Sequence, residues 1–273
     1  IRQVDAICHV VRCFQDDNIT HVSGKVDPLD DVETINLELI FADLESIEKR
    51  YTRISKIART KDKDAVRELE ILEKIKTTLE EGKSARTIEF TPEEEPLVKS
   101  LFLLTTKPVL YVANISEEDV IAGGDNEMVQ AVREFAATEG AEVVTVCARI
   151  EEEVAELDDE EKAEFLAELG IKESGLDQLI RKAYTLLGLG TYFTAGEKEV
   201  RAWTFRLGMK APQTAGIIHT DFERGFIRAE TVSYADLLAY GSMQAAKEAG
   251  KVRLEGKDYV VQDGDVMEFR FNV

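Results

Sequence analysis

The sequence contains few cysteines, a single tryptophan and no long hydrophobic run. Its three cysteines, Cys8, Cys13 and Cys147, form neither an even set nor a CxxC pair, which argues against a disulfide framework and the common zinc motifs. All three lie in apolar, strand-like surroundings, so we interpret them as buried, reduced thiols. The longest apolar runs, such as residues 109–113, are far too short to cross a bilayer. We therefore expect a cytoplasmic protein with no membrane partner.

Basic residues are scarce relative to acidic ones. With 34 Lys and Arg against 54 Asp and Glu, the 273-residue chain has a formal net charge of −20 at pH 7. This argues against a general nucleic-acid coat, because phosphate contacts need clustered cations. Residues 189–273 hold 11 basic and 12 acidic residues, net −1, and the remainder holds 23 basic and 42 acidic, net −19. The near-neutral C-terminal part could approach RNA where the rest could not.

A phosphate-binding loop is missing as well. Gly82-Lys83-Ser84 resembles the end of a Walker A loop, but that motif needs an earlier glycine where this chain has Thr77. A helical pattern precedes it instead of a strand, and no Asp-x-x-Gly motif of a second switch occurs. The residues that would hold Mg²⁺ and the terminal phosphates are therefore absent from this sequence. Because the chain also starts at Ile1 rather than Met, we expect further sequence upstream in the intact protein.

Two stretches have the periodicity of long amphipathic helices. After a short apolar strand at 5–14 and a polar loop, apolar residues recur every three or four positions over 31–59 and again over 62–79. This pattern favours an antiparallel helical hairpin joined by a short polar turn. The alternative is a single irregular helical layer packed on a sheet.

From residue 108 the pattern changes to that of a βαβ unit. Residues 108–113 and 143–147 are apolar runs typical of buried strands, and residues 128–139 between them form an amphipathic helix. Such a unit implies a parallel sheet that binds ligands at the carboxyl ends of its strands. An acidic helical segment follows to about residue 187, and the remaining residues predict a small β-grasp domain. Its expected elements are strands at 200–206, 257–261 and 266–271 and one helix near 233–240.

The most informative motif follows the strand at 108–113 and reads Asn114-Ile115-Ser116-Glu117. P-loop GTPases carry Asn-Lys-x-Asp here; the Asp carboxylate accepts two hydrogen bonds from guanine, and the Asn braces the loop. In this chain Glu is one methylene longer than Asp, and Ile replaces the Lys. Adenine presents an acceptor where guanine presents a donor, so the change weakens guanine selection and leaves room for adenine. The alternative is a polar cap that only closes the strand.

Two further positions are candidates for the same site. Cys147 and Ala148 end the next strand, where a small-residue loop would pack against the base. His21 lies in a polar loop and could position or polarise an attacking water, although a loop histidine is more often only solvated. His9 and His219 look structural. The three histidines share no ligand spacing, so we predict no metal site made by residues of this chain.

These segments together resemble the YchF family, the Obg-like ATPases of the translation-factor branch of P-loop GTPases. The resemblance covers essentially the whole chain. The order of residues 219–228 is its most specific part, because neither fold nor composition demands it. The segments that carry it are DAICHVVRCF (5–14), HVSGK (21–25), NISE (114–117), TYFTAG (191–196), VRAW (200–203), HTDFERGFIR (219–228) and GKDY (256–259).

The resemblance implies an α/β fold in which a partial Ras-like, parallel-sheet P-loop domain is interrupted by the helical hairpin and followed by a TGS domain of β-grasp type. The corresponding ranges are 1–30 with 100–188 for the nucleotide-binding domain, 31–99 for the hairpin and 189–273 for the TGS domain. It also implies Mg²⁺-dependent hydrolysis of ATP, and of GTP less well, with the magnesium ligands upstream of this chain.

The resemblance assigns roles to the candidate residues. The main chain at Ile115 would read the base edge, and His21 would replace the usual catalytic glutamine. The residues expected around the base are Asn114, Ile115, Glu117, Cys147 and Ala148. The expected partner is the ribosome, through its large subunit, with RNA contact possible through the TGS domain. The protein is expected to be a monomer.

Two other classes of function stay open. The chain could be a non-catalytic ribosome- or RNA-binding module that acts through the hairpin and the TGS domain, because it has no phosphate loop of its own. Alone, it is expected to bind nucleotide very weakly and to hydrolyse none. A purely structural coiled-coil protein would explain the hairpin but would leave the βαβ unit without a role.

Overall fold

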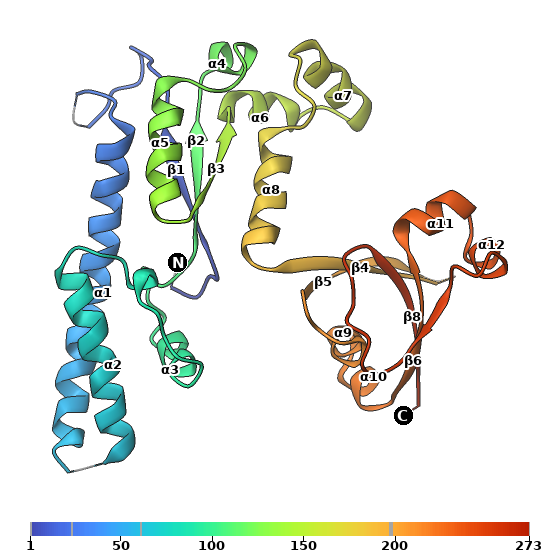
Figure 1. Ribbon diagram of the computed structural model, residues 1–273. Helices are drawn as coiled ribbons and strands as arrows, with labels where there is room; N and C mark the ends of the chain where they lie inside the picture. Colours follow the sequence, from blue (N-terminus) through green and yellow to red (C-terminus); the bar gives the residue numbers. More distant parts are fainter. Residues whose placement is uncertain (1, 23, 61, 197–198, 273) are drawn as a thin grey trace. The chain divides into compact units, whose positions relative to one another are not determined.

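The structure is a computed structural model that describes residues 2–22, 24–60, 62–196 and 199–272. The chain forms two compact units, Ile1–Ala183 and Tyr184–Val273. Unit 1 contains a three-stranded parallel sheet, and unit 2 contains a five-stranded sheet (Figure 1). The predicted α/β fold class is confirmed. Within the described residues, no helix is both long enough and apolar enough to cross a membrane.

The parallel sheet of unit 1 consists of β1 (Ile7–Arg12), β2 (Val109–Asn114) and β3 (Glu142–Val146), in that order. β2 lies in the centre and is buried at all but its last residue, as expected for a parallel strand covered on both faces. That last residue pairs with Arg12 of β1 and with Val146 of β3. All three strands therefore end at the same edge of the sheet.

The burial of β1 differs from the prediction. Val11 is buried, but Cys8 is exposed and Val10 is 64% exposed. Successive side chains of a strand point to opposite faces of a sheet, and the described residues leave the face with Cys8 and Val10 open. The prediction of three buried cysteines is therefore wrong for Cys8, whereas Cys13 and Cys147 are buried.

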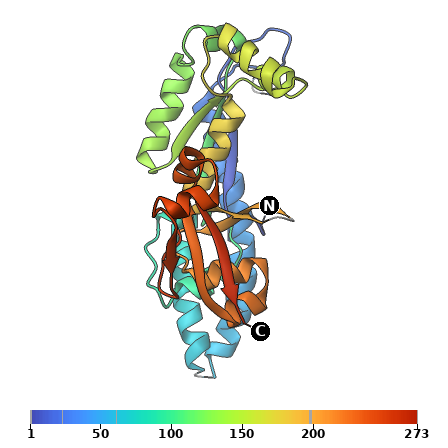
Figure 2. The same cartoon turned by 90° about the vertical axis from the view of Figure 1, so that its right-hand side faces the viewer.

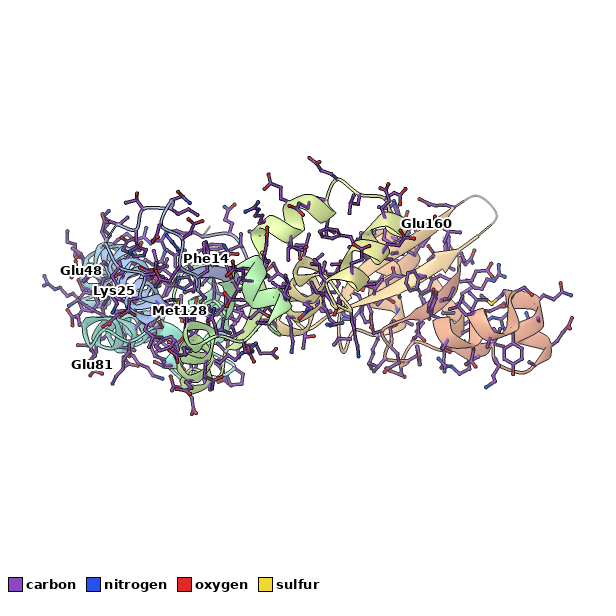
Figure 3. All side chains as sticks on the ribbon, turned by 90° about the horizontal axis from the view of Figure 1, so that it is seen from above. Phe14, Lys25, Glu48, Glu81, Met128 and Glu160 are labelled. Carbon is purple, nitrogen blue, oxygen red and sulfur yellow. The ribbon has the colours of Figure 1, made fainter. Side chains whose placement is uncertain are left out.

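Two long helices, α1 (Pro28–Ala58) and α2 (Lys63–Glu80), form the hairpin, which extends away from the sheet (Figures 1 and 2). Asp27 and Asp62 cap them by accepting hydrogen bonds from first-turn amides. Charged side chains such as Glu48 point outward (Figure 3). The apolar side chains form a core of their own. The two helices therefore form the predicted hairpin, and not the alternative of a single helical layer packed on a sheet. This core contains Ile40, Ile47, Ile54, Ile71, Leu72, Ile75 and Leu79.

A buried carboxylate, Asp43, ties α1 to the segment that leaves the hairpin. Its Oδ1 accepts hydrogen bonds from the Leu104 amide at 3.0 Å and from Arg2 at 2.9 Å. Its Oδ2 accepts from the amide and the hydroxyl of Thr105, at 2.7 and 2.8 Å. A fully buried carboxylate is tolerated only when its oxygens are satisfied in this way. Asp43 thus fixes the path by which the chain returns to β2.

Shorter helices complete unit 1, and the last of them continues into unit 2. They are η1 (Ala85–Thr87), α3 (Glu95–Ser100), α4 (Glu117–Ile121), α5 (Glu127–Thr138), α6 (Ala148–Val154), α7 (Asp159–Glu168) and α8 (Gly175–Leu186). α5 packs against β2, β3 and α1. Gly82 of the Walker-like sequence follows α2 with a φ of +74°, a left-handed conformation that commonly ends helices. The Walker-like sequence therefore marks the end of helix α2.

Unit 2 has the strand order β5-β4-β8-β6-β7, with β4 and β8 parallel and the other neighbours antiparallel. Its core includes Tyr192, Phe205 and Met267. The strands are β4 (Leu189–Ala195), β5 (Val200–Arg206), β6 (Phe226–Ser233), β7 (Arg253–Glu255) and β8 (Asp265–Phe271). The helices are α9 (Ala211–Ile218), α10 (Thr220–Arg224), α11 (Tyr234–Tyr240) and α12 (Met243–Glu248).

The strand predicted at 257–261 is not formed. Tyr259 closes a turn, its carbonyl accepts from the Ala211 amide at 2.9 Å, and the Val261 amide donates to Met209 at 3.1 Å. These backbone groups therefore bond to the residues around the start of α9 and do not form a sheet ladder. The edge of the sheet is formed by β7 instead. The strands β4, β6 and β7 were not predicted, and more helices than the expected one surround the sheet.

Replacement of Asp43 by alanine should lower the free energy of unfolding by about 3 kcal/mol, because buried donors on Leu104 and Thr105 lose their acceptor. Urea unfolding followed by far-UV circular dichroism measures the loss. The matched control is Glu45→Ala on the same helix, whose carboxylate is exposed and pairs with Lys49; its midpoint should match the wild type. An Asp43→Ala protein as stable as this control would contradict the assigned role.

Candidate functional site

The carboxyl ends of the three parallel strands open onto a cavity of about 640 Å³. All five residues expected around a base line it, so the structure brings them together at the edge where parallel α/β sheets bind ligands. The cavity is lined by Phe14, Gln15, Asp16 and Ile19 from the loop after β1, by Asn114, Ile115, Ser116, Glu117 and Glu118 after β2, and by Cys147, Ala148, Arg149 and Glu152 after β3.

Asn114 joins β2 to both of its neighbours. Its Oδ1 accepts a hydrogen bond from the Ala148 amide at 3.1 Å. Its main-chain carbonyl accepts one from the Cys13 amide at 2.8 Å, and the Ile115 amide donates to the Val146 carbonyl at 2.9 Å. The loops that follow all three strands are thereby held to one another. This is the bracing role that the sequence motif predicts for the asparagine.

Glu117 is the first residue of α4. Ser116 and Asp119 close the start of this helix reciprocally, since the Ser116 hydroxyl accepts from the Asp119 amide at 3.1 Å and the Asp119 carboxylate accepts from the Ser116 amide at 3.3 Å. The carboxylate of Glu117 is thus carried on a capped helical turn. Its Oε1 lies 2.7 Å from Nε of Arg149, in the first turn of α6.

The side chains of Glu117 and Arg149 differ in how far they are exposed to solvent. The arginine side chain is 75% exposed, and the glutamate side chain is 40% exposed. The glutamate atom Oε1 is itself buried and, within the described part of the chain, receives no hydrogen bond of normal geometry. The contact is therefore an ion pair made by charge and proximity, and it covers one of the two carboxylate oxygens.

The loop after β1 forms a further wall, which the sequence reasoning missed. Arg12 organises it by donating to three main-chain carbonyls, those of Phe14 at 3.2 Å, Ile19 at 3.1 Å and Asp16 at 3.3 Å. The guanidinium carbon also lies 4.8 Å from the centre of the Phe14 ring. The signal available in the sequence was topological: a first strand parallel to the others must place its following loop at the same edge.

The two thiols near the cavity are unreactive by environment. Burial raises the pKa of Cys147, although nearby backbone hydrogen bonds oppose the rise. Burial also raises the pKa of Cys13 to about 12, with smaller contributions from neighbouring carboxylates. Both groups therefore stay protonated at neutral pH and present small, apolar surfaces.

The histidines lie apart from the cavity residues. Among the described residues, His21 is not part of the lining; it lies between β1 and α1, with Nε2 3.0 Å from Oδ2 of Asp31. His219 caps α10 by accepting from a first-turn amide. His9 is buried with its ring centre 5.4 Å from that of Tyr111, and burial lowers its pKa. The structural interpretation of His9 and His219 fits these contacts.

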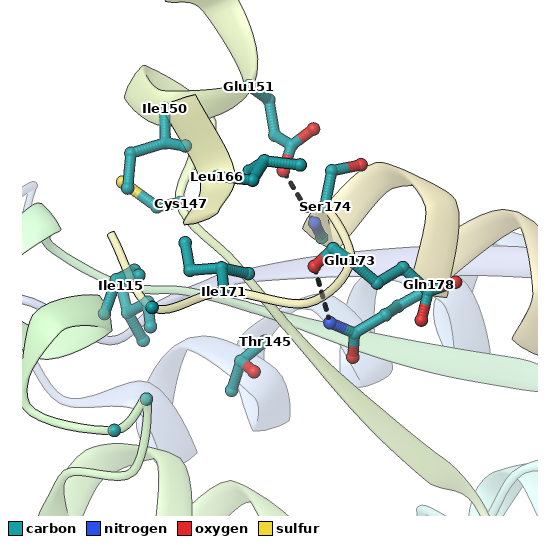
Figure 4. A pocket seen from close by; sticks show the side chains of 15 residues that line it. Ile115, Thr145, Cys147, Ile150, Glu151, Leu166, Ile171, Glu173, Ser174 and Gln178 are labelled. Carbon is teal, nitrogen blue, oxygen red and sulfur yellow. Dashed lines mark hydrogen bonds between the residues drawn. The ribbon is translucent and has the colours of Figure 1, made fainter. Parts of the chain in front are cut away.

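A smaller cavity of about 230 Å³ shares Ile115 and Cys147 with the first (Figure 4). On its border, Oε1 of Glu151 accepts a hydrogen bond from the Gly175 amide at 2.7 Å. A Cβ atom at Gly175 would lie 3.0 Å from the Cα of Val146, so glycine allows α8 to begin directly against the end of β3. This packing supports the loop that carries Cys147.

Comparisons with known proteins give a consistent picture. A family model named YchF-GTPase_C, described as a protein of unknown function (DUF933), matches residues 189–272. Over 273 residues the chain is 71% identical to the ribosome-binding ATPase YchF of Bacillus subtilis, covering 100% of this chain and 75% of that protein. It is 56% identical to the ribosome-binding ATPase YchF of Haemophilus influenzae, covering 100% of this chain and 74% of the relative.

Solved structures agree with these relatives. The YchF GTPase of Schizosaccharomyces pombe superposes with a TM-score of 0.86 at 37% identity, over 98% of this chain and 73% of that one. A GTP binding protein from Pyrococcus horikoshii OT3 superposes with a TM-score of 0.60 at 16% identity, over 99% of this chain and 80% of that one. The second likeness is one of fold.

Replacement of Asn114 by alanine should destabilise unit 1 by about 1 kcal/mol, because the Ala148 amide loses its acceptor. Asn114→Asp keeps an oxygen in place and should retain most of the stability. Urea unfolding followed by far-UV circular dichroism compares the two variants, and fluorescence of Trp203, the single tryptophan, follows unit 2 as an internal reference. Equal unfolding midpoints for Asn114→Ala and the wild type would show that Asn114 braces nothing.

Proposed function

The chain belongs to the YchF family, and from that premise we propose that it supplies the base-binding part of a ribosome-associated P-loop ATPase that hydrolyses ATP and, less well, GTP. The observation that carries the proposal is the cavity where the loops after β1, β2 and β3 meet. Its volume of about 640 Å³ is within the range of sites for small molecules and cofactors. The relatives' names contribute the ATPase activity and the ribosome.

The main chain at Ile115 supports a preference for adenine. Because the Ile115 amide already donates to Val146, a base edge read here by the main chain would meet the Ile115 carbonyl, which is an acceptor. An acceptor suits the amino group of adenine and opposes the carbonyl oxygen of guanine. Asn114 holds this loop, and Cys147 and Ala148 provide small surfaces against which a purine can pack.

The phosphate part of the reaction is assigned to sequence outside this chain. The described residues contain no group of three or more His, Cys, Asp or Glu side chains suited to a metal ion, and the sequence has no Walker A loop. Mg²⁺, when bound with ATP, neutralises charge on the terminal phosphates. The residues of this chain would bind and orient the base.

His21 is proposed as the residue that positions the attacking water. Its contact with Asp31 supports this role, because a carboxylate 3.0 Å from Nε2 holds the imidazole ring in one orientation. The proposal requires that the loop with His21 approach the terminal phosphate when nucleotide is bound. Asp31 would then orient the ring and take no part in the chemistry.

The hairpin and unit 2 are the proposed ribosome-binding parts. We take the domains as 1–30 with 100–188 for nucleotide, 31–99 for the hairpin and 189–273 for a TGS domain of β-grasp type. The last carries a net charge of −1, against −19 for the rest, which makes it the part best able to approach RNA. We propose a cytoplasmic monomer that contacts the large ribosomal subunit. A non-catalytic role in ribosome binding is the second candidate.

Turnover by the intact protein tests the enzymatic proposal. ATP should be hydrolysed faster than GTP, and His21→Ala should reduce kcat by roughly 100-fold, the usual contribution of a positioned acid–base group. The chain 1–273 alone should hydrolyse neither nucleotide. A strong preference for GTP would refute the base assignment, and full activity of His21→Ala would remove the catalytic role. His219→Ala, at a helix cap, is the matched histidine control.

Co-sedimentation with ribosomes tests the partner. The intact protein should pellet with ribosomes, and removal of residues 189–273 should reduce the bound fraction. The bound fraction of a variant that lacks the tip of the hairpin should show whether the hairpin and unit 2 act together in ribosome binding. Equal binding with and without residues 189–273 would eliminate the proposed role of unit 2, while leaving the ATPase assignment to be judged by turnover.

A further inference from the structure

The ion pair between Glu117 and Arg149 bears on how this cavity selects a purine. The glutamate occupies the motif position from which a carboxylate reads guanine, but its Oε1 is buried and lies 2.7 Å from the arginine. An oxygen that water cannot reach is also out of reach of a base edge unless the pair opens. Guanine, which needs a carboxylate facing its N–H donors, therefore competes with Arg149 for the same group.

The arginine also changes what the cavity offers to a base. Among the described residues of the lining, Arg149 is the one basic side chain, and it lies with the carboxylates of Asp16, Glu117, Glu118 and Glu152. A guanidinium is a donor with no acceptor capacity. It matches the ring nitrogen acceptor of adenine, whereas guanine has a donor at that ring position.

We propose that Arg149 is a specificity-determining residue, which masks the Glu117 carboxylate and turns a guanine-reading position into one that favours adenine. The inference rests on the proposed function, because it assumes that a purine occupies this cavity. It places the selectivity in a pair of side chains, and not in the longer glutamate alone. Removal of the arginine should free the carboxylate and restore part of the preference for guanine.

The size of the effect follows from the exposure of the pair. Exposed ion pairs contribute little in water, because solvent screens the charges and the side chains lose freedom. We therefore expect a change of about three- to fivefold in the ratio of ATP to GTP affinity. Both affinities should also fall together, because the loss of the cation leaves the acidic lining to repel nucleotide phosphates. The ratio, and not either affinity, is the diagnostic quantity.

The experiment is an equilibrium titration of the intact protein with ATP and with GTP. Arg149→Ala should shift the ratio of dissociation constants about three- to fivefold toward GTP, and Arg149→Lys, which keeps the charge, should shift it less. Adding Glu117→Ala to Arg149→Ala should make the shift smaller, since no carboxylate is left to read guanine and only the loss of the guanidinium donor remains. Arg133→Ala removes an exposed arginine that pairs with Asp125 outside the cavity lining, and it should leave the ratio unchanged.

The outcomes separate the two proposals. A wild-type protein that binds ATP no better than GTP would refute the base assignment under the proposed function. A wild-type preference for ATP that survives unaltered in Arg149→Ala would overturn the role of Arg149 alone. That role would also be overturned if the double variant shifted as far toward GTP as Arg149→Ala, because the shift would then not come from Glu117. Thermal unfolding of each variant shows whether it is folded.

Discussion

The hydrogen bond from the Ala148 amide to the Asn114 side chain is the contact on which the arrangement of the site depends. β2 is buried in the middle of the sheet, so the packing of this strand fixes the position of its last residue independently of the loops. One side chain at that point reaches across to the first residue of α6, while the main chain holds the end of β1. Three loops far apart in sequence are thereby set at fixed distances from one another.

Each of those loops has its own support, so the cavity is shaped from several directions. Arg12 donates hydrogen bonds to main-chain carbonyls of the loop after β1, and the capping box of Ser116 and Asp119 fixes the loop after β2. The third rests on the start of α8, where Gly175 approaches Val146 without a side chain between them. Such supporting contacts keep a binding site preorganised, which reduces the cost of ordering it when a ligand arrives.

The sequence allowed most of unit 1 to be predicted, because its signals are local. Buried parallel strands and the helical periodicity both appear in short windows. The Asn114 motif could be placed because a βαβ unit fixes where strand ends lie. The contacts of Arg12 and Arg149 could not be predicted, since they depend on side-chain directions in three dimensions. Unit 2 was harder, because backbone groups of Tyr259 and Val261 bond to a distant segment in place of a ladder.

The continuity of α1 has a mechanical consequence. Val32, near its start, belongs to the core beneath the sheet, and Ile40, Ile47 and Ile54, further along, belong to the core of the hairpin. The helix crosses from one core to the other without a break, and Asp43 clamps it near the crossing. A force applied at the tip of the hairpin would therefore travel along one stiff rod into the layer beside β1. Bending would have to deform the rod itself, since no hinge interrupts it.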